Sequence, residues 1–182
     1  MHDFFENLRR NCEIRKIPLI SRETQDFLAQ KIQEKKPKKV LEIGSAIGYS
    51  TCRISQLINQ RKGSIASFEI SYPAYLEATK NLQKIQAKNA VLYPFDFNEI
   101  RLESFFSENF DFVFIDARKS QYGNYLEKIQ EILKPENTII LDDVIKYQNK
   151  LSLLYSFLQK NQVFYEIFDM EVGDGVMLIE NQ

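Results

Sequence analysis

Short apolar runs alternate with longer amphipathic stretches along most of this chain. β-branched and aromatic residues dominate the apolar runs, which lie at 40–43, 65–70, 90–95, 110–115 and 138–141. The stretches between them show the apolar spacing of helices. Parallel strands need long crossover connections, so this alternation predicts a parallel β-sheet with helices on both faces.

The first 36 residues predict a helical segment ahead of the sheet. Ser21 can cap a helix, and Glu23 in the first turn suits the helix dipole. The apolar positions that follow share one helical face. We expect this helix over residues 22–35, ending before Pro37, because the residue before a proline disfavours the helical backbone.

The end of the chain follows a different pattern. After a predicted helix over 146–160, two strand-like runs at 164–170 and 176–179 are joined by the short link 171–175, which contains glycine. So short a link makes the two strands antiparallel. The chain is therefore predicted to have an α/β, doubly wound, Rossmann-like fold, with a mostly parallel seven-stranded sheet and one antiparallel strand near the C-terminus.

Length and composition predict one globular domain. A chain of 182 residues can bury about two-thirds of its unfolded surface, so we expect a single domain over 1–182, with a helical segment at 1–36 and the core at 37–182. The formal net charge of −1 argues against disorder and against a uniformly basic nucleic-acid binder. We find no run long enough for a membrane span and no signal peptide pattern, which favours a cytoplasmic protein.

Cysteine and histidine usage narrows the possible chemistry. Cys12 and Cys52 make neither a disulfide framework nor a paired zinc motif, which fits a reducing compartment. The single histidine, His2, lies at a terminus, where order is usually poor. This excludes Ser-His-Asp, Cys-His and His-ligated zinc sites unless a partner supplies the histidine. Catalysis then depends on Lys, Asp, Glu, Tyr or a cofactor.

The first predicted strand runs into a turn that contains Gly44 and Gly48, followed by a helix. Such a turn lets the backbone approach a ligand, and the helix offers free N–H groups. The full G-x-G-x-x-G spacing is missing, and Glu42 would repel a pyrophosphate but attract a cationic ligand. S-adenosylmethionine, with its sulfonium and ammonium groups, meets this requirement. The alternative is a tight turn without a ligand.

Acids also follow the second and third predicted strands. Glu69 lies about twenty residues beyond Gly48, where doubly wound folds bind a ribose diol; alone, it could equally be a solvated strand-end acid. Asp96 could accept a hydrogen bond from an adenine amino group while Phe95 and Phe97 pack on the ring. It could instead cap the helix that follows.

The fourth and fifth predicted strands end in Asp116 and in Asp142 with Asp143. Neighbouring parallel strands would bring these carboxylates to one edge, where they repel one another unless a divalent cation or a proton intervenes. The alternative is three acids that cap helices and face water. Lys119 could deprotonate a hydroxyl acidified by a metal if nearby positive charge lowers the lysine's own pKa, although most such lysines are simply solvated.

These residues together resemble the class I methyltransferases. They are most similar to the cation-dependent O-methyltransferase family, which includes catechol and caffeoyl-coenzyme A O-methyltransferases and bacterial relatives that act on tRNA hydroxyuridine. The likeness covers residues 20–179 approximately and rests on 40–44 with 48–50, on 112–117 with Lys119, on 133–135 with 139–143, and on 173–175.

The resemblance implies S-adenosylmethionine as cofactor and a divalent cation such as Mg²⁺. It implies Lys119 as the base and Asp116, Asp142 and Asp143 as metal ligands. The metal would lower the pKa of the acceptor hydroxyl and align it for attack on the methyl group. The residues expected to line the cofactor are Ile20, Glu42, Gly44, Ser45, Gly48, Tyr49, Ser50, Glu69, Phe95, Asp96 and Asp116.

Three departures from the family pattern concern the acceptor side. Asp143 stands where the family usually has Asn, and Arg118 stands where bacterial relatives often have an acid. The chain also lacks the longer insertion after Asp143 that helps to enclose small substrates. We therefore expect an open site for a small-molecule or tRNA hydroxyl acceptor, with a homodimer as a further expectation from the family.

Metal-assisted O-methyl transfer is the leading hypothesis, and three others stay open. The first is methyl transfer on the same fold without a metal, or to N or C. The second is nucleotide or dinucleotide binding without transfer, against which Glu42 and the missing third glycine speak. The third is a non-catalytic RNA-binding or scaffold protein, suggested by a basic cluster that Glu34 interrupts: Lys31, Lys35, Lys36, Lys38 and Lys39.

Overall fold

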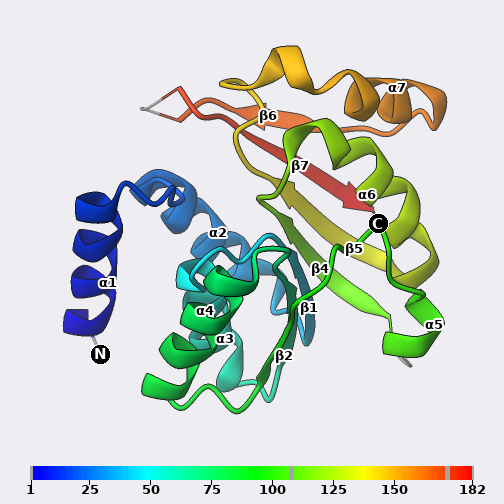
Figure 1. Ribbon diagram of the computed structural model, residues 1–182. Coiled ribbons are helices and arrows are strands. Elements are labelled where there is room, and N and C mark those ends of the chain that lie inside the picture. Colours follow the sequence, from blue (N-terminus) through cyan, green and yellow to red (C-terminus); the bar gives the residue numbers. More distant parts are fainter. Residues whose placement is uncertain (1, 107–108, 171–172, 182) are drawn as a thin grey trace.

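The protein is built on one seven-stranded sheet (Figure 1). A computed structural model describes residues 2–106, 109–170 and 173–181. The strand order is β3-β2-β1-β4-β5-β7-β6, and β7 alone runs against its neighbours β5 and β6. This confirms the predicted fold class. The strands are β1 (Lys39–Ile43), β2 (Ser64–Phe68), β3 (Ala90–Tyr93), β4 (Phe110–Ile115), β5 (Leu133–Leu141), β6 (Glu166–Phe168) and β7 (Val176–Asn181).

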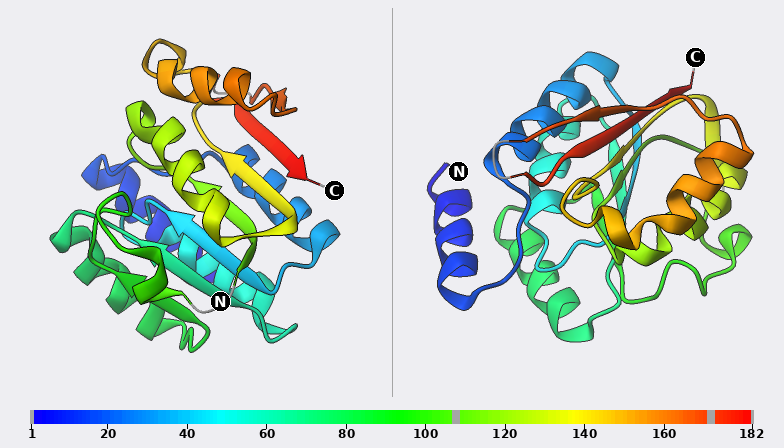
Figure 2. Two further views of the ribbon diagram at one scale, coloured as in Figure 1. Left: turned by 90° about the vertical axis from the view of Figure 1, so that its right-hand side faces the viewer. Right: turned by 90° about the horizontal axis from the view of Figure 1, so that it is seen from above.

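Helices cover both faces of the sheet, as the views of Figure 2 show. The first four pack on one face and the last three on the other. Short 3-10 turns lie at Lys119–Gln121, Gln130–Ile132 and Gln148–Lys150. The helices are α1 (His2–Arg15), α2 (Arg22–Lys35), α3 (Tyr49–Asn59), α4 (Tyr72–Lys84), α5 (Leu102–Phe105), α6 (Tyr122–Ile129) and α7 (Ser152–Lys160).

Strand β4 shows why the central strands are almost continuously apolar. Phe112 and Phe114 pack in the cluster under α1 to α4, whereas Val113 and Ile115 pack in the cluster under α5 to α7. All four side chains are buried. A strand buried on both faces cannot show polar alternation, and this run of apolar residues places β4 in the middle of the sheet.

Several predicted bounds agree with the structure and others do not. α2 and β4 have the expected limits, and the Ser21 hydroxyl accepts from the backbone N–H of Thr24 as a helix cap should. β2 and β3 end earlier than predicted, and β5 begins earlier, at Leu133. The last helix begins at Ser152, because residues 148–150 form a separate 3-10 turn.

The N-terminal segment is more regular than the sequence indicated. α1 begins at His2, whose position in the sequence predicted poor order. The expected link between β6 and β7 includes residues 171–172, which lie outside the described residues. In the part of the chain that the structure describes, no helix is long and apolar enough to span a membrane.

Hydrogen bonds beyond the strand ends bring three loops to one edge of the sheet. The N–H of Gly44 donates to the Phe68 carbonyl at 2.9 Å, and that of Asp116 donates to the Ile43 carbonyl at 3.0 Å. The N–H of Asp142 continues the series to the Ile115 carbonyl, also at 3.0 Å. The loops after β1, β4 and β5 are therefore adjacent at the carboxyl edge, where open α/β sheets bind ligands.

Candidate active site

A cleft of about 190 Å³ opens at this carboxyl edge. It lies between the turn after β1 and the ends of β2, β3 and β4. Five residues expected at the cofactor line it: Gly44, Glu69, Phe95, Asp96 and Asp116. The other lining residues are Ile43, Ala46, Phe68, Ile70, Phe97, Ala117, Arg118 and Tyr125.

Gly44 is required by the close approach of two loops. Its φ is +93°, and a Cβ built on it would lie 2.2 Å from the carbonyl oxygen of Asp116. Any side chain would therefore displace the loop after β4 as well as strain the backbone. The turn after β1 and the backbone of Asp116 are in this way fixed against each other.

Glu69 holds the turn from the neighbouring strand end. Its carboxylate accepts from the N–H of Ala46 and from that of Ser71, each at 2.8 Å. The residue is nearly buried but still lines the cleft. Because each carboxylate oxygen has a second lone pair, Glu69 can bind a hydroxyl in the cleft while it fixes the turn.

Asp96 lies at the cleft as expected but does not cap the helix that follows it. Its Oδ1 accepts from the N–H of Asn98 at 2.9 Å, which closes a local turn rather than capping a regular helix. Asp96 also lines the cleft, beside the exposed Phe95. The local hydrogen bond does not prevent the side chain from meeting a ligand.

Glu42 lies beneath the turn rather than in the cleft. It is 0% exposed, and its Oε2 accepts from the hydroxyls of Thr51 and Ser67. Its Oε1 has no hydrogen-bond partner among the described residues. Burial raises the pKa of Glu42 to about 7.

The remaining expected cofactor residues are not among those that line this cleft. Gly48 caps α3 with a φ of +82° and offers no side-chain hydrogen bond to the helix end. The Tyr49 hydroxyl donates to Oε1 of Gln25. Gly48, Tyr49 and Ser50 form the N-terminal end of α3, and Ile20 and Ser45 are buried.

The three aspartates at the carboxyl edge, called the acidic group below, lie close together as expected. One carboxylate oxygen from each of Asp116, Asp142 and Asp143 can be chosen so that all lie within 4.8 Å of one another. Burial, followed by the charges of Asp116 and Asp143, raises the pKa of Asp142 to about 7. Thr24 donates to Oδ1 of Asp142 at 3.3 Å, so α2 reaches this group too.

Lys119 lies inside the acidic group. Its Nζ is 2.7 Å from Oδ1 of Asp116 and 3.0 Å from Oδ2 of Asp143, and it donates to the Tyr122 hydroxyl at 2.9 Å. The side chain is only 10% exposed. Burial lowers the pKa of Lys119, but Tyr122 and the two aspartates outweigh burial and raise it above the ordinary value. A lysine that acts as the base needs a lowered pKa, whereas the described residues raise the pKa of Lys119.

The donor set nevertheless fits a hard divalent cation. Three carboxylate oxygens at this spacing are the ligands that Mg²⁺ accepts, and other positions stay open for water or an acceptor. Asp143 has a φ of +62°, which turns the chain sharply after Asp142. The ammonium of Lys119 supplies the positive charge at this point in the structure.

Three contributors were not predicted from the sequence. Tyr122 and Thr24 contact the acidic group through their hydroxyls, and Tyr125 lines the cleft. Arg118, noted in the sequence as a departure from the family, also lines the cleft. Tyr122 follows Lys119 by three residues, a spacing that could have signalled the contact. Thr24 carries no such signal, because it belongs to a different helix.

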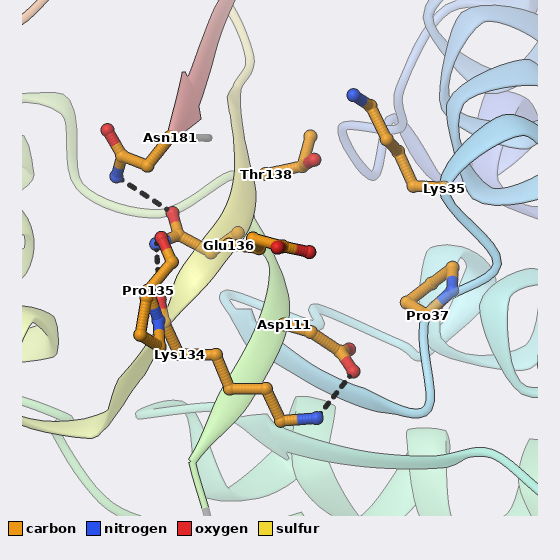
Figure 3. Close-up of a pocket in the computed structure, with 9 residues that line it drawn as sticks. Lys35, Pro37, Asp111, Lys134, Pro135, Glu136, Thr138 and Asn181 are labelled. Atoms are coloured by element: carbon orange, nitrogen blue, oxygen red, sulfur yellow. Dashed lines mark hydrogen bonds and ion pairs between the residues drawn. The ribbon is translucent and has the colours of Figure 1, made fainter.

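The opposite edge of the sheet holds a larger groove of about 540 Å³, seen in Figure 3. Asp111 accepts from the N–H groups of Lys38 and Lys39 and from Lys134 Nζ at 2.9 Å. Lys35 pairs with Glu180 at 3.0 Å. Part of the basic cluster noted in the sequence therefore lies here, away from the cleft and the aspartates.

Comparison with known proteins decides the family. The family model described as O-methyltransferase matches residues 1–181. The chain belongs to the O-methyltransferase family. This confirms the resemblance noted in the sequence, and homologues in the family are S-adenosylmethionine-dependent O-methyltransferases.

Individual relatives of this member of the O-methyltransferase family are distant. The caffeoyl-CoA O-methyltransferase of Stellaria longipes is 26% identical over 115 residues, which cover 60% of this chain and only 47% of the plant enzyme. The O-methyltransferase of Bacillus cereus, solved with S-adenosylhomocysteine, has a TM-score of 0.86 at 20% identity, over 99% of this chain and 91% of that one. TomG of Streptomyces achromogenes, solved with S-adenosylmethionine, has a TM-score of 0.83 at 16% identity, over 98% and 89%.

Proposed function

We propose that this chain transfers the methyl group of S-adenosylmethionine to a hydroxyl oxygen, with a divalent cation at the three aspartates. One observation carries the proposal: Asp116 belongs both to the cleft and to the acidic group. A methyl donor in the cleft and a hydroxyl at the aspartates would thus share one residue as their boundary. The donor and the acceptor must meet for direct transfer, and this arrangement allows it.

The cofactor part of the proposal assigns two sides of the glycine turn. The adenosine would occupy the cleft, with Glu69 on the ribose and Asp96 with Phe95 at the base. The methionine end would lie at the N-terminus of α3, near Ile20, Ser45, Gly48, Tyr49 and Ser50, with Glu42 beneath the turn. The close approach at Gly44 supports this, and the Bacillus and Streptomyces proteins were solved with this type of ligand.

The metal part of the proposal rests on the oxygen donors of Asp116, Asp142 and Asp143. A divalent cation there would supply Lewis acidity that lowers the pKa of an acceptor hydroxyl. Thr24 orients Asp142 through the hydrogen bond at 3.3 Å. Lys119 is protonated between Asp116 and Asp143, so to act as the base it must leave these contacts and release that proton to water before it accepts one from the acceptor.

The same contacts favour a second candidate, which is transfer without a metal. Lys119 already places a positive charge within 3.0 Å of two of the three aspartates. An ammonium in this position would orient an acceptor hydroxyl through a charge-assisted hydrogen bond. The two candidates therefore differ in which cation occupies the acidic group during the reaction.

Methyl transfer to a panel of hydroxyl compounds, with and without EDTA, separates the two candidates. For the metal-assisted reaction, EDTA and Asp142→Asn should each lower the rate by about a hundredfold or more, the scale for losing a charge-stabilising group. Asp174→Asn is the matched control, because Asp174 is a nearly buried aspartate outside the group, paired with Lys146. Transfer that persists in EDTA would leave the metal-free candidate, and absence of S-adenosylhomocysteine binding would overturn both.

The acceptor is proposed only as a hydroxyl compound. The basic cluster that could nominate tRNA lies partly at the edge opposite the aspartates, so it adds no support for that acceptor. A small-molecule acceptor is consistent with the name of the Stellaria longipes relative, a caffeoyl-CoA O-methyltransferase. Homodimerisation and a cytoplasmic location stay predictions from the sequence.

A further inference from the structure

Arg9, on α1, is a buried cation. The residue is 7% exposed. Its two terminal nitrogens donate to the Ile20 carbonyl, each at 3.2 Å, and Nη2 also reaches Oε1 of Gln25 at 3.4 Å. Its Nε is buried and has no acceptor among the described residues.

No carboxylate of the described residues pairs with this charge. Glu6, one turn before Arg9, is paired with Arg22 through two hydrogen bonds of 3.0 and 2.8 Å. Glu13, one turn after, is exposed. Within residues 2–106, 109–170 and 173–181, Arg9 forms no ion pair with an acid. A buried charge without a counter-ion is costly, which is the state expected of a cation kept for an anionic ligand.

The guanidinium lies against the start of α3. Its Cζ is 4.7 Å from the centroid of the Tyr49 ring, and Tyr49 shares Gln25 with Arg9 as a hydrogen-bond partner. Gly48 has no side chain that could cap α3, so no side-chain cap bonds the first N–H groups of this helix. These N–H groups form the positive end of the helix dipole. The guanidinium therefore packs on the ring of Tyr49, the first residue of the helix whose positive end lies there.

We propose that Arg9 is a positioning residue for the α-carboxylate of the methyl donor. The inference rests on the proposed function, which places the methionine end of the cofactor at the N-terminus of α3. Arg9 acts through its neighbours: it fixes the Ile20 carbonyl, Gln25 and the Tyr49 ring, and its charge favours an anion at the helix end. α1, which carried no chemical motif in the sequence, thereby contributes to the donor site.

The test compares two ligands by calorimetry. S-adenosylhomocysteine carries the carboxylate, whereas its decarboxylated form keeps the ammonium and lacks only that group. We expect Arg9→Gln to weaken S-adenosylhomocysteine about tenfold and the decarboxylated ligand less than about twofold, the scale of one partly buried charge at a helix end. In turnover, the KM for S-adenosylmethionine should rise by about the same factor while kcat changes little.

Two further variants control for structural effects. Arg9→Lys keeps the charge and should recover part of the lost affinity. Arg53→Gln is the matched control, because the Arg53 guanidinium also lies 4.7 Å from an aromatic ring centroid, that of Phe5. We expect Arg53→Gln to leave the affinities of both ligands unchanged.

The possible outcomes are distinguishable. Equal loss of both ligands in Arg9→Gln would show that Arg9 only holds α1 in place, and no loss of either would also overturn the inference. If neither ligand binds the wild-type protein, the proposed function itself fails. Should Arg9→Gln not fold, the Arg9 Nε resonance of the wild-type protein decides: it should shift with S-adenosylhomocysteine and not with the decarboxylated ligand, and equal shifts with both would overturn the role.

Discussion

The two edges of the sheet carry similar residues in opposite electrostatic conditions. At the edge shown in Figure 3, a groove of about 540 Å³ contains acids and lysines joined in pairs, such as Lys134 with Asp111. At the carboxyl edge, a cleft of about 190 Å³ adjoins three aspartates, two of which pair with the same lysine. The charges in the larger groove are thus paired, whereas those beside the smaller cleft are not balanced.

In the function proposed above, the site is marked by unbalanced charge rather than by volume. Asp142 and Glu42, at or beneath the carboxyl edge, both have a pKa raised to about 7, in each case chiefly by burial. Groups held in such unfavourable states are typical of ligand sites, because a bound ligand can relieve them. The groove at the other edge has no comparable imbalance among its described residues.

The largest expected effect comes from Gly44→Ala, which breaks the crowded edge itself. The new Cβ would displace the Asp116 carbonyl, so we expect a loss of more than about 3 kcal/mol of folding stability or of cofactor affinity, beyond the cost of a strained backbone alone. Urea unfolding and calorimetry with S-adenosylhomocysteine measure the two.

Gly173→Ala is the control for backbone strain. Gly173 has a φ of +69°, but nothing lies within 4 Å of its added Cβ. If both variants lose the same stability and cofactor affinity, the close approach of the two loops does not matter.

Glu42→Gln tests the cost of the buried acid. Folding raises the pKa of Glu42 from 4.5 to about 7, so the stability that this group contributes below pH 4.5 is lost as the pH rises to about 7. Glutamine carries no titrating proton. The variant should therefore gain up to about 3 kcal/mol of unfolding free energy relative to wild type between pH 4.5 and pH 8.

Urea unfolding at both pH values measures this gain. Glu136→Gln, at an exposed acid in the groove of the other edge, is the matched control. A constant difference between Glu42→Gln and wild type at all pH values would show that Glu42 is not held protonated.

Lys119→Gln tests the lysine that pairs with both Asp116 and Asp143. Without the ammonium, we expect Mn²⁺ to bind about tenfold more tightly, because one competing positive charge near two carboxylates is gone. Methyl transfer should fall in the same variant. Calorimetry with Mn²⁺ gives the affinity, and Lys134→Gln, which removes the paired lysine of the other edge, should leave it unchanged.

The smallest effect is expected from Asp111→Asn, in the groove at the edge opposite the aspartates. The amide can keep part of the hydrogen bonding to Lys38 and Lys39 but loses the charge that faces Lys134. We expect a loss of about 1 kcal/mol in unfolding free energy and unchanged methyl transfer. Reduced transfer in this variant would mean that the two edges are coupled.

Local signals in the sequence predicted the elements whose limits are set locally. α2 has its expected bounds because Ser21 caps it and Pro37 follows it. The helix expected over 146–160 begins at Ser152 instead, and the ring of Tyr147, just before it, lies within 6 Å of three lysine ammonium groups: Lys119, Lys146 and Lys150. Of these, the contact with Lys119 is tertiary and cannot be seen in helical periodicity.

The acidic group was predictable to the level of which strands carry it. Parallel neighbours end at one edge, so Asp116 and Asp142 had to be close. The position of the Lys119 ammonium was not predictable, because it depends on side-chain direction and on Tyr122 beneath it. The contact from Thr24 was hidden for the same reason, since it requires α2 to be docked.

The left-handed backbone at Asp143 also limits how this site can vary through evolution. At a φ of +62°, Gly, Asn and Asp are the residues most favoured, and of these only Asn and Asp present a side-chain oxygen. Exchange between Asn and Asp replaces a single heavy atom and leaves the fold of the loop intact. Exchange of Asp143 for Asn would therefore change the charge that the loop presents to a cation by one unit, with almost no change in side-chain shape.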